Sequence, residues 1–226
     1  MRASAVIFDM DGLMLDTERI ALIVWRDAAA DLGFTLDDDV AERMVGRTSA
    51  TNRLMLQMQF GETFSYDKLS VLAESRYRET LDRDGVPRKD GLIELLDFLE
   101  SRSIPRAVAT STARDLARHK LAQAGVAPYF DVVVGGNEVA HGKPAPDIFL
   151  RAAERLGKLP AECVVLEDSG PGIQGAASAG MVPILIPDRG RVPLPDTRAR
   201  AAFVVDSLSA ARPIIERLIA GSASTS

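Results

Sequence analysis

The stretch Val6-Ile7-Phe8-Asp9-Met10-Asp11-Gly12 decides the fold, because it joins a buried strand to two acidic side chains. Its three apolar residues predict a strand, and the two aspartates follow directly. Alternate side chains of a strand lie on the same face, so both carboxylates can converge on one point if the strand geometry continues. Two anions this close repel each other unless a cation or a proton lies between them. A hard cation such as Mg²⁺ takes oxygen ligands of this kind.

Gly12 allows the backbone to turn sharply and brings N–H groups near a bound anion. An ordinary turn after a strand has the same sequence, so this stretch alone leaves both interpretations open. Three later segments favour a functional site. They are Thr110-Ser111, which ends a second apolar strand, Gly142-Lys143-Pro144, which supplies a lysine, and Glu167-Asp168-Ser169, which ends another strand with two carboxylates.

In this order, the four segments resemble the motifs of the haloacid dehalogenase-like (HAD) hydrolase superfamily. The resemblance extends from Phe8 to about Asp206 and is greatest to the branch of β-phosphoglucomutase and the phosphoglycolate-phosphatase-like enzymes. It implies an α/β fold, in which a Rossmann-like parallel sheet carries helices on both faces and a helical cap domain is inserted.

The sequence that follows Asp16 shows only helical patterns up to about residue 83. Apolar residues recur at helical spacing from Ala21 to Leu32, and further helices are predicted over 37–45, 49–59 and 66–83. No convincing strand lies among them. We therefore assign residues 17–86 to a helical cap, and residues 1–16 and 87–226 to a catalytic core.

From Asp90 the pattern changes to short apolar strands that alternate with helices. The predicted strands are Arg106–Thr110, Asp131–Val134, Glu162–Leu166, Val182–Ile186 and Ala202–Val205, and the predicted helices are 91–102, 113–124, 146–156, 171–179 and 209–218. This alternation predicts right-handed crossovers and a parallel sheet buried on both faces. Ligands bind beyond the carboxyl ends of such strands, where Asp9, Thr110 and Asp168 stand. The prolines of Pro187–Thr197 predict a surface loop.

Composition and charge argue against several classes of function. The chain has 226 residues, of which 46% are hydrophobic and 26% charged, and its formal net charge of −5 gives no reason to expect nucleic-acid binding. No apolar run approaches the ~20 residues of a membrane helix, and the first residues do not resemble a signal peptide. We expect a cytoplasmic monomer whose partner is a small phosphorylated metabolite. Cys163, the single cysteine, is expected to pack in a strand without a reactive role.

The resemblance implies roles for the acidic residues. It makes Asp9 the nucleophile that forms an aspartyl-phosphate, and Asp11 the general acid and base that protonates the leaving alcohol and then deprotonates water. Asp9, the main-chain carbonyl of Asp11, Glu167 and Asp168 are the implied Mg²⁺ ligands. Asp168 is the better candidate for a direct ligand, and Glu167 binds either directly or through water. A purely structural role remains open for this pair, since Ser169 is placed to cap the next helix.

Thr110, Ser111, Gly12 and Lys143 are the predicted phosphate contacts of the core. Thr110 and Ser111 precede a helix, so hydroxyl groups and helix-start N–H groups point to one place, although a plain helix cap uses the same residues. Lys143 precedes a proline-rich helix entry and is the catalytic point charge that can neutralise both Asp9 and a phosphate.

The predicted cap carries a polar cluster around Gly46. Arg47 is its candidate for binding a second anionic group, and a solvated helix face is an equally good interpretation. The cluster consists of Arg43, Arg47, Thr48, Ser49 and Arg53.

The predicted reaction is the hydrolysis of a phosphoric monoester by a Mg²⁺-dependent phosphatase. A β-phosphoglucomutase-like isomerase is the alternative, but that relative keeps a histidine, a lysine and an arginine at positions that match Ala21, Val45 and Ser49 here. A dehalogenase would not use Asp11 with a metal, and a non-catalytic protein would not keep Asp9 and Lys143. Phosphoglycolate, sugar phosphates and nucleoside monophosphates all stay open as substrates.

Overall fold

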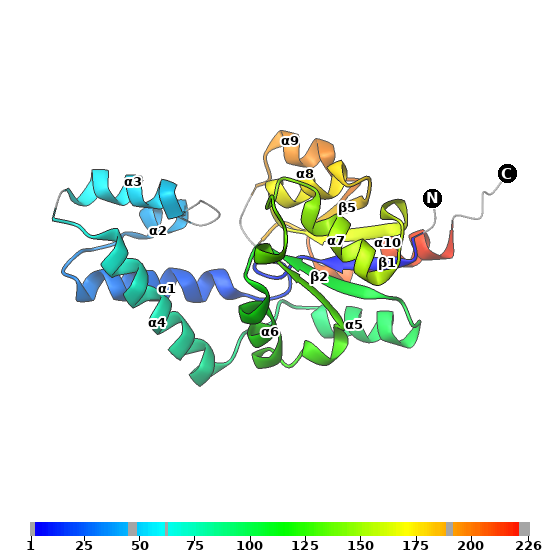
Figure 1. Cartoon of the computed structure of the whole chain (residues 1–226), viewed down its shortest axis with the longest axis horizontal. Coiled ribbons are helices and arrows are strands. Elements are labelled where there is room, and N and C mark those ends of the chain that lie inside the picture. Colours follow the sequence, from blue (N-terminus) through cyan, green and yellow to red (C-terminus); the bar gives the residue numbers. More distant parts are fainter. Residues whose placement is uncertain (1–2, 45–48, 62, 189–191, 222–226) are drawn as a thin grey trace. The chain divides into compact units, whose positions relative to one another are not determined.

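A computed structural model describes residues 3–44, 49–61, 63–188 and 192–221 (Figure 1). The chain packs into two compact units. One consists of Met1–Leu15 and Pro87–Ser226, and the other of Asp16–Val86.

The first unit is built on a parallel sheet of six strands, in the order β3-β2-β1-β4-β5-β6. The strands are β1 Ala5–Phe8, β2 Arg106–Thr110, β3 Val132–Gly135, β4 Cys163–Glu167, β5 Val182–Leu185 and β6 Phe203–Val204. The central strands are buried along nearly their whole length, as their continuous apolar sequences require. The predicted α/β fold is confirmed, and β1 with its two aspartates lies in the middle of the sheet.

Helices cover both faces of this sheet (Figure 1). α7 and α8 lie on one face, where Ile7, Val165 and Phe149 share a buried apolar cluster. α5 and α6 lie on the other face, where the Phe8 and Phe130 rings pack in a T-shaped arrangement with their centroids 5.6 Å apart. The helices are α5 Leu92–Ser101, α6 Arg114–Gln123, α7 Asp147–Leu156, α8 Gly170–Ser178 and α10 Leu208–Ala220, with the 3-10 turns Ala127–Tyr129, Gly136–Glu138 and Pro160–Glu162.

The surface loop predicted over Pro187–Thr197 ends earlier than the sequence suggested, so this boundary was predicted wrongly. A short helix, α9 Pro195–Arg200, begins within it. A proline at the first helical position has a suitable φ and lacks an N–H group that the helix would leave without a partner there. Asp196 in the first turn adds a favourable charge at the helix start. Proline therefore marks the start of a helix here.

The two stretches of the first unit that flank the inserted segment lie side by side. Leu15 and Arg88 form an antiparallel bridge, and the Lys89 N–H group donates a hydrogen bond of 2.8 Å to the Met14 carbonyl oxygen. The segment that separates them in sequence therefore leaves and re-enters the first unit at one place.

The second unit contains α1 Thr17–Asp31, α2 Asp38–Met44, α3 Ser49–Phe60 and α4 Tyr66–Asp84, and no strand lies within its described residues. α1 packs against α4, with the Trp25 and Tyr66 rings 5.8 Å apart. The rings of Phe34, Phe60 and Phe64 form a further cluster, at 5.2 to 5.3 Å between centroids. Aromatic packing thus gives this helical insert its own apolar core.

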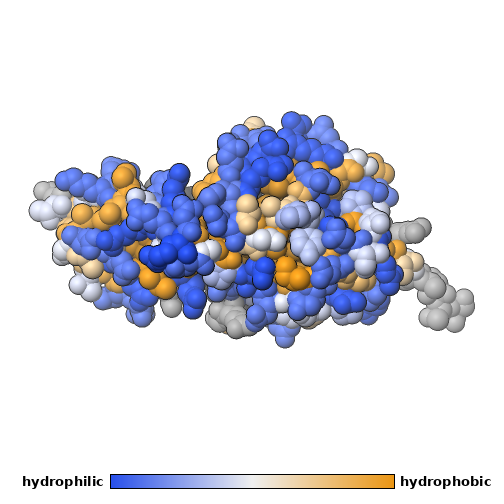
Figure 2. All heavy atoms as spheres, turned by 90° about the horizontal axis from the view of Figure 1, so that it is seen from below, coloured by the Kyte–Doolittle hydropathy of each residue, from blue (hydrophilic) through white to orange (hydrophobic). Residues whose placement is uncertain are grey.

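Figure 2 shows one face as largely hydrophilic, with apolar residues scattered in small groups. Within the described ranges, no helix combines the length and the apolar character needed to cross a bilayer.

Candidate active site

Asp9 lies directly beyond the carboxyl end of β1. Because alternate residues of a strand face the same side of the sheet, Asp9 lies on the same side as Ile7. Its N–H group continues the ladder to the Leu166 carbonyl oxygen at 3.0 Å. Glu167 follows Val165 in the same alternation on the neighbouring strand, and Lys143 enters from the turn before α7 on that side. The three predicted site residues are thereby brought together.

Lys143 lies between two buried carboxylates. Its Nζ atom contacts Asp9 Oδ1 and donates a hydrogen bond of 2.6 Å to Glu167 Oε1. The Lys143 side chain is 6% exposed, and Glu167 is fully buried. A lysine fixed by two anions holds its charge at one point, as neutralisation of a nucleophile and a phosphate requires.

Glu167 connects this ion pair to the start of α8. Its Oε2 atom accepts hydrogen bonds of 2.8 Å from both the N–H and the Oγ group of Ser169. The Ser169 Oγ atom in turn accepts the Gly172 N–H at 3.1 Å, so Ser169 caps the helix as the sequence suggested. A Cβ atom at Gly172 would collide with the Glu167 carboxylate, which explains the glycine.

Burial raises the pKa of the Asp9 carboxyl group to about 7. The Lys143 ammonium opposes this shift, while Glu167 and Asp11 add to it. Burial alone would lower the pKa of Lys143, but Asp9 and Glu167 outweigh burial and raise this pKa above its usual value. Lys143 therefore stays charged, and Asp9 lies in a site where negative charge is in excess.

The strand geometry does not continue to Asp11, and its carboxylate has hydrogen-bond partners other than Lys143. After Met10 the chain turns, and the N–H groups of Met14 and Leu15 both donate to the Met10 carbonyl oxygen. Asp11 instead accepts a hydrogen bond of 2.8 Å from Lys120 Nζ on Oδ1, and one of 2.7 Å from Thr112 Oγ1 on Oδ2. Each aspartate is thus held by its own lysine.

Gly12 makes this turn with φ +89°, a conformation that side chains other than glycine rarely adopt. Its N–H group donates to the Leu15 carbonyl oxygen at 2.9 Å, and a Cβ atom would collide with the Asp168 carboxylate. Gly12 therefore makes room for Asp168. Because its N–H group is used in the turn, its contact with phosphate stays a prediction.

Thr110 and Ser111 stand where the sequence placed them, at the end of β2 and before α6. Thr110 is buried, and its Oγ1 atom accepts the Thr112 N–H at 3.1 Å, whereas Ser111 is exposed. Neither caps α6, because the N-cap residue is Ala113 and has no side-chain hydrogen bond. The plain-cap alternative is therefore wrong, and the phosphate role of both residues stays a prediction.

The residues present fit a magnesium ion. Across the described parts of the chain, no three Asp, Glu, His or Cys side chains gather as a metal site. Mg²⁺, however, commonly takes one or two carboxylates and completes its shell with carbonyl oxygens and water. Asp9 and Asp168 follow the adjacent strands β1 and β4, and the raised pKa of Asp9 reflects a buried acid beside two others, Glu167 and Asp11. A cation at this edge would relieve that repulsion.

The predicted cap contacts are described only in part. Arg47 and its neighbours Val45, Gly46 and Thr48 lie outside the described residues, as does the side chain of Ser49. Arg53 is paired within the second unit, because its guanidinium group donates to both oxygens of Asp67 at 2.9 and 2.5 Å.

Lys120 and Thr112 are the residues that sequence reasoning missed. Lys120 is 5% exposed and shares the buried face of α6 with Ala117, Leu121 and Ala124, at the spacing i, i+3, i+4 and i+7. A lysine in an apolar helical stripe is unusual, since lysine is almost never buried without a partner. That pattern is the signal that could have identified it.

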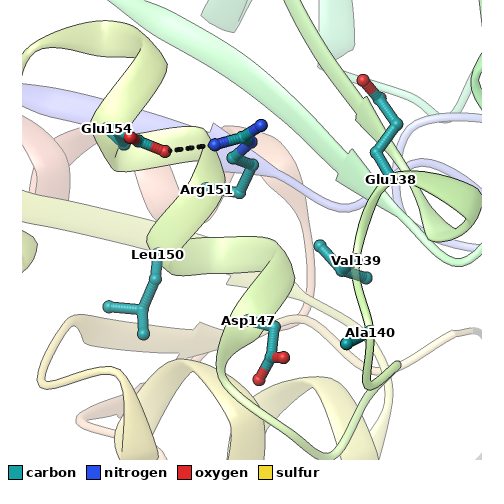
Figure 3. Close-up of a pocket in the computed structure, with 7 residues that line it drawn as sticks. All are labelled: Glu138, Val139, Ala140, Asp147, Leu150, Arg151 and Glu154. Atoms are coloured by element: carbon teal, nitrogen blue, oxygen red, sulfur yellow. Dashed lines mark hydrogen bonds and ion pairs between the residues drawn. The ribbon is translucent and has the colours of Figure 1, made fainter.

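A separate shallow hollow of about 380 Å³ lies beside α7 (Figure 3). Arg151 reaches Glu154 at 2.8 Å on one side of it, as Figure 3 shows. Its described lining includes none of the predicted site residues, so it plays no part in the arrangement around Asp9. The lining consists of Glu138, Val139, Ala140, Asp147, Leu150, Arg151 and Glu154.

Cys163 is buried in β4, and burial raises the pKa of its thiol to about 11. Because the thiolate is the reactive form, we expect the folded protein to resist alkylation by iodoacetamide at pH 8, and the urea-unfolded protein to react readily. Mass spectrometry of both samples measures the difference. Equal alkylation rates in the two states would contradict an inert structural cysteine.

The sequence is similar to that of known hydrolases. The family model described as haloacid dehalogenase-like hydrolase matches residues 3–180. The phosphorylated carbohydrates phosphatase of Thermotoga maritima is 35% identical over 181 residues, which cover 78% of this chain and 82% of that protein. The fructose-1-phosphate phosphatase YqaB of Escherichia coli is 36% identical over 182 residues, covering 80% and 94%.

The fold is shared with solved structures of the same group. A Thermotoga maritima protein provisionally described as a β-phosphoglucomutase matches with a TM-score of 0.81 and 29% identity, over 96% of this chain and 99% of that one. The family match covers more than half of the chain, and both phosphatases exceed 30% identity. The chain therefore belongs to the haloacid dehalogenase-like hydrolases, in the β-phosphoglucomutase-like branch.

Proposed function

We propose that this chain is a Mg²⁺-dependent phosphatase that hydrolyses small phosphorylated metabolites through an aspartyl-phosphate on Asp9. The observation that carries the proposal is the buried pairing of Asp9 with Lys143 and Glu167 at the carboxyl edge of β1 and β4, with Asp11 held close by on other partners. A carboxylate so placed can act as a nucleophile beside a fixed positive charge.

The reaction proceeds in two displacements. An Asp9 carboxylate oxygen attacks phosphorus, the bond from phosphorus to the ester oxygen breaks, and Asp11 gives its proton to the leaving alcohol. Water then attacks the same phosphorus, Asp11 takes a proton from that water, and the bond to Asp9 breaks to release inorganic phosphate. Lys143 faces Asp9 throughout and offsets charge on the phosphoryl oxygens.

Asp9, the Asp11 carbonyl oxygen and Asp168 would hold the metal ion. Bound there, Mg²⁺ supplies charge neutralisation for the phosphoryl group and holds it in line with the nucleophile. Both carboxylate oxygens of Glu167 already accept hydrogen bonds from Lys143 and Ser169. We therefore assign Glu167 to the metal through a water molecule rather than directly.

Sugar phosphates are the substrate class that we favour. Support comes from the two relatives, whose names state phosphorylated carbohydrates and fructose 1-phosphate as their substrates. We assign residues 17–86 the role of a cap that selects among such substrates, with Arg47 as the candidate for a second anionic group. Caps of this kind commonly limit water access and choose the leaving group.

A β-phosphoglucomutase-like reaction is the second candidate, because the matching Thermotoga maritima structure carries that description. A mutase needs cap groups that engage the sugar and restrain hydrolysis. In the β-phosphoglucomutases that this sequence resembles, a histidine, a lysine and an arginine stand at the positions that match Ala21, Val45 and Ser49, and none of these three residues carries a charge. These residues favour water over a sugar hydroxyl as the phosphoryl acceptor.

A panel of phosphate esters tests the proposal. We expect Mg²⁺-dependent release of inorganic phosphate from sugar phosphates, with the Asp9→Asn variant as the inactive control. With β-glucose 1-phosphate and a trace of β-glucose 1,6-bisphosphate, we expect inorganic phosphate and little glucose 6-phosphate. Glucose 6-phosphate forming faster than phosphate would make the protein a mutase, and no release from any ester would overturn the phosphatase.

A further inference from the structure

Both oxygens of the Asp11 carboxylate accept hydrogen bonds from side chains on the side of the sheet opposite to α7. Lys120 Nζ donates to Oδ1 at 2.8 Å, and Thr112 Oγ1 donates to Oδ2 at 2.7 Å. Lys120 is on α6, and Thr112 stands in the turn between β2 and α6. Two donors on two oxygens fix the plane of a carboxylate as well as its position, which one contact cannot do.

Packing alone does not account for Lys120. Its neighbours on the buried face of α6 are Ala117 and Leu121, and an apolar side chain would fill this place without the cost of removing an ammonium group from water. The ion pair with Asp11 helps to offset this cost. The position of Lys120 is therefore better explained by a polar partner such as Asp11 than by apolar packing.

The two aspartates are held from opposite faces of the sheet. Lys143, from the α7 side, lies between Asp9 and Glu167. Lys120, from the α6 side, holds Asp11. With a lysine of its own, Asp11 does not compete with Asp9 for Lys143, so the nucleophile and the proton-transfer group keep separate positions.

We propose that Lys120, with Thr112, is a positioning residue that orients the Asp11 carboxylate for proton transfer to the leaving alcohol and from water. The proposal rests on the proposed function, in which Asp11 carries the proton. It concerns geometry alone: Lys120 touches neither the substrate nor phosphorus, and it acts only through Asp11. A displacement of about 1 Å in such a group can cost roughly 10²-fold in rate.

The test compares esters whose leaving groups differ in their need for a proton. We expect Lys120→Met to lower kcat/KM for a sugar phosphate by about 10- to 100-fold. The loss should be much smaller for 4-nitrophenyl phosphate, whose leaving group departs without protonation. Lys120→Arg should restore part of the rate. Lys158→Met, which changes a lysine near the opposite, amino edge of the sheet, is the matched control and should leave both rates unchanged.

Thr112 gives a second test that leaves the buried charge in place. Thr112→Val removes the hydroxyl group at nearly constant volume, and Thr112→Ser keeps it. We expect the valine variant to show the same leaving-group dependence as Lys120→Met, and the serine variant to resemble the wild type. This pair decides the question if Lys120→Met does not fold, which circular dichroism would reveal.

A double-mutant cycle completes the test. Because Lys120 acts through Asp11, Lys120→Met should cost little further rate in an Asp11→Asn background. Additive losses, equal losses for both esters, or wild-type rates in both Lys120→Met and Thr112→Val would overturn the inference. These outcomes need an active wild-type enzyme. A wild type that releases no phosphate from any ester would instead refute the proposed function.

Discussion

Replacing Asp9 by asparagine should abolish phosphate release, with a loss of kcat on the order of 10⁴-fold or more, as is found when an enzyme loses its nucleophile. An amide cannot form the acyl-phosphate, whereas its size allows it to keep the place of the carboxylate. Lys143 retains Glu167 as a partner, so the fold should survive the change. Phosphate release by the purified variant, together with its circular dichroism spectrum, measures both expectations.

Asp196→Asn, in the exposed helix α9, is the matched control and should keep the wild-type rate. An Asp9→Asn protein that still turned over at a rate near that of the wild type would rule out the covalent mechanism. Loss of the fold in the variant would instead contradict the expectation that Lys143 and Glu167 remain paired without Asp9.

The same variant should reveal the raised pKa of Asp9 as a pH dependence of stability. Burial raises this pKa from 3.8 to about 7 in the folded, metal-free chain. The folded protein therefore binds the proton more tightly than the unfolded chain does. The contribution of protonated Asp9 to the free energy of unfolding is complete below the pKa that Asp9 has in the unfolded chain. It is lost as the pH rises through about 7. In excess chelator, the unfolding free energy of the wild type should fall relative to that of Asp9→Asn between about pH 5 and 7.5. A constant difference between the two proteins would contradict the shift.

Removal of Mg²⁺ should have an effect of similar size. Chelation should bring phosphate release down to background, and added Mg²⁺ should restore it, since the carboxylates near Asp9 leave negative charge in excess. Binding to the folded state also raises the unfolding temperature. Mg²⁺ should therefore raise the thermal midpoint of the wild type, and raise that of Asp168→Asn distinctly less.

The control for this shift is Asp196→Asn, which should respond to Mg²⁺ as the wild type does. Full turnover of any phosphate ester in excess chelator would show that the reaction needs no metal. Equal thermal shifts in the wild type and in Asp168→Asn would place the ion away from Asp168.

The fold follows from the sequence because strands such as Val182–Leu185 are apolar along their whole length and alternate with amphipathic helices. The meeting of Asp9, Lys143 and Glu167 follows too, since parallel strands end at one edge of a sheet. The orientation of the Asp11 side chain does not follow from the sequence, because it depends on the turn at Gly12 rather than on strand periodicity. The role of Lys120 does not follow from the sequence either. Its partner is distant in sequence, and only its place in an apolar helical stripe indicated burial.

The antiparallel bridge between Leu15 and Arg88 makes the protein modular. Because the ends of the inserted segment are pinned together by the first unit, the segment can change length at little thermodynamic cost. In a flexible chain, each doubling of the length of a closed loop adds only about 0.6 kcal/mol to the entropic cost of closing it. Under the proposed function, the residues of this segment that select a substrate can therefore change while the sheet, with its aspartates and lysines, stays unaltered. One chemical apparatus can in this way serve many metabolites.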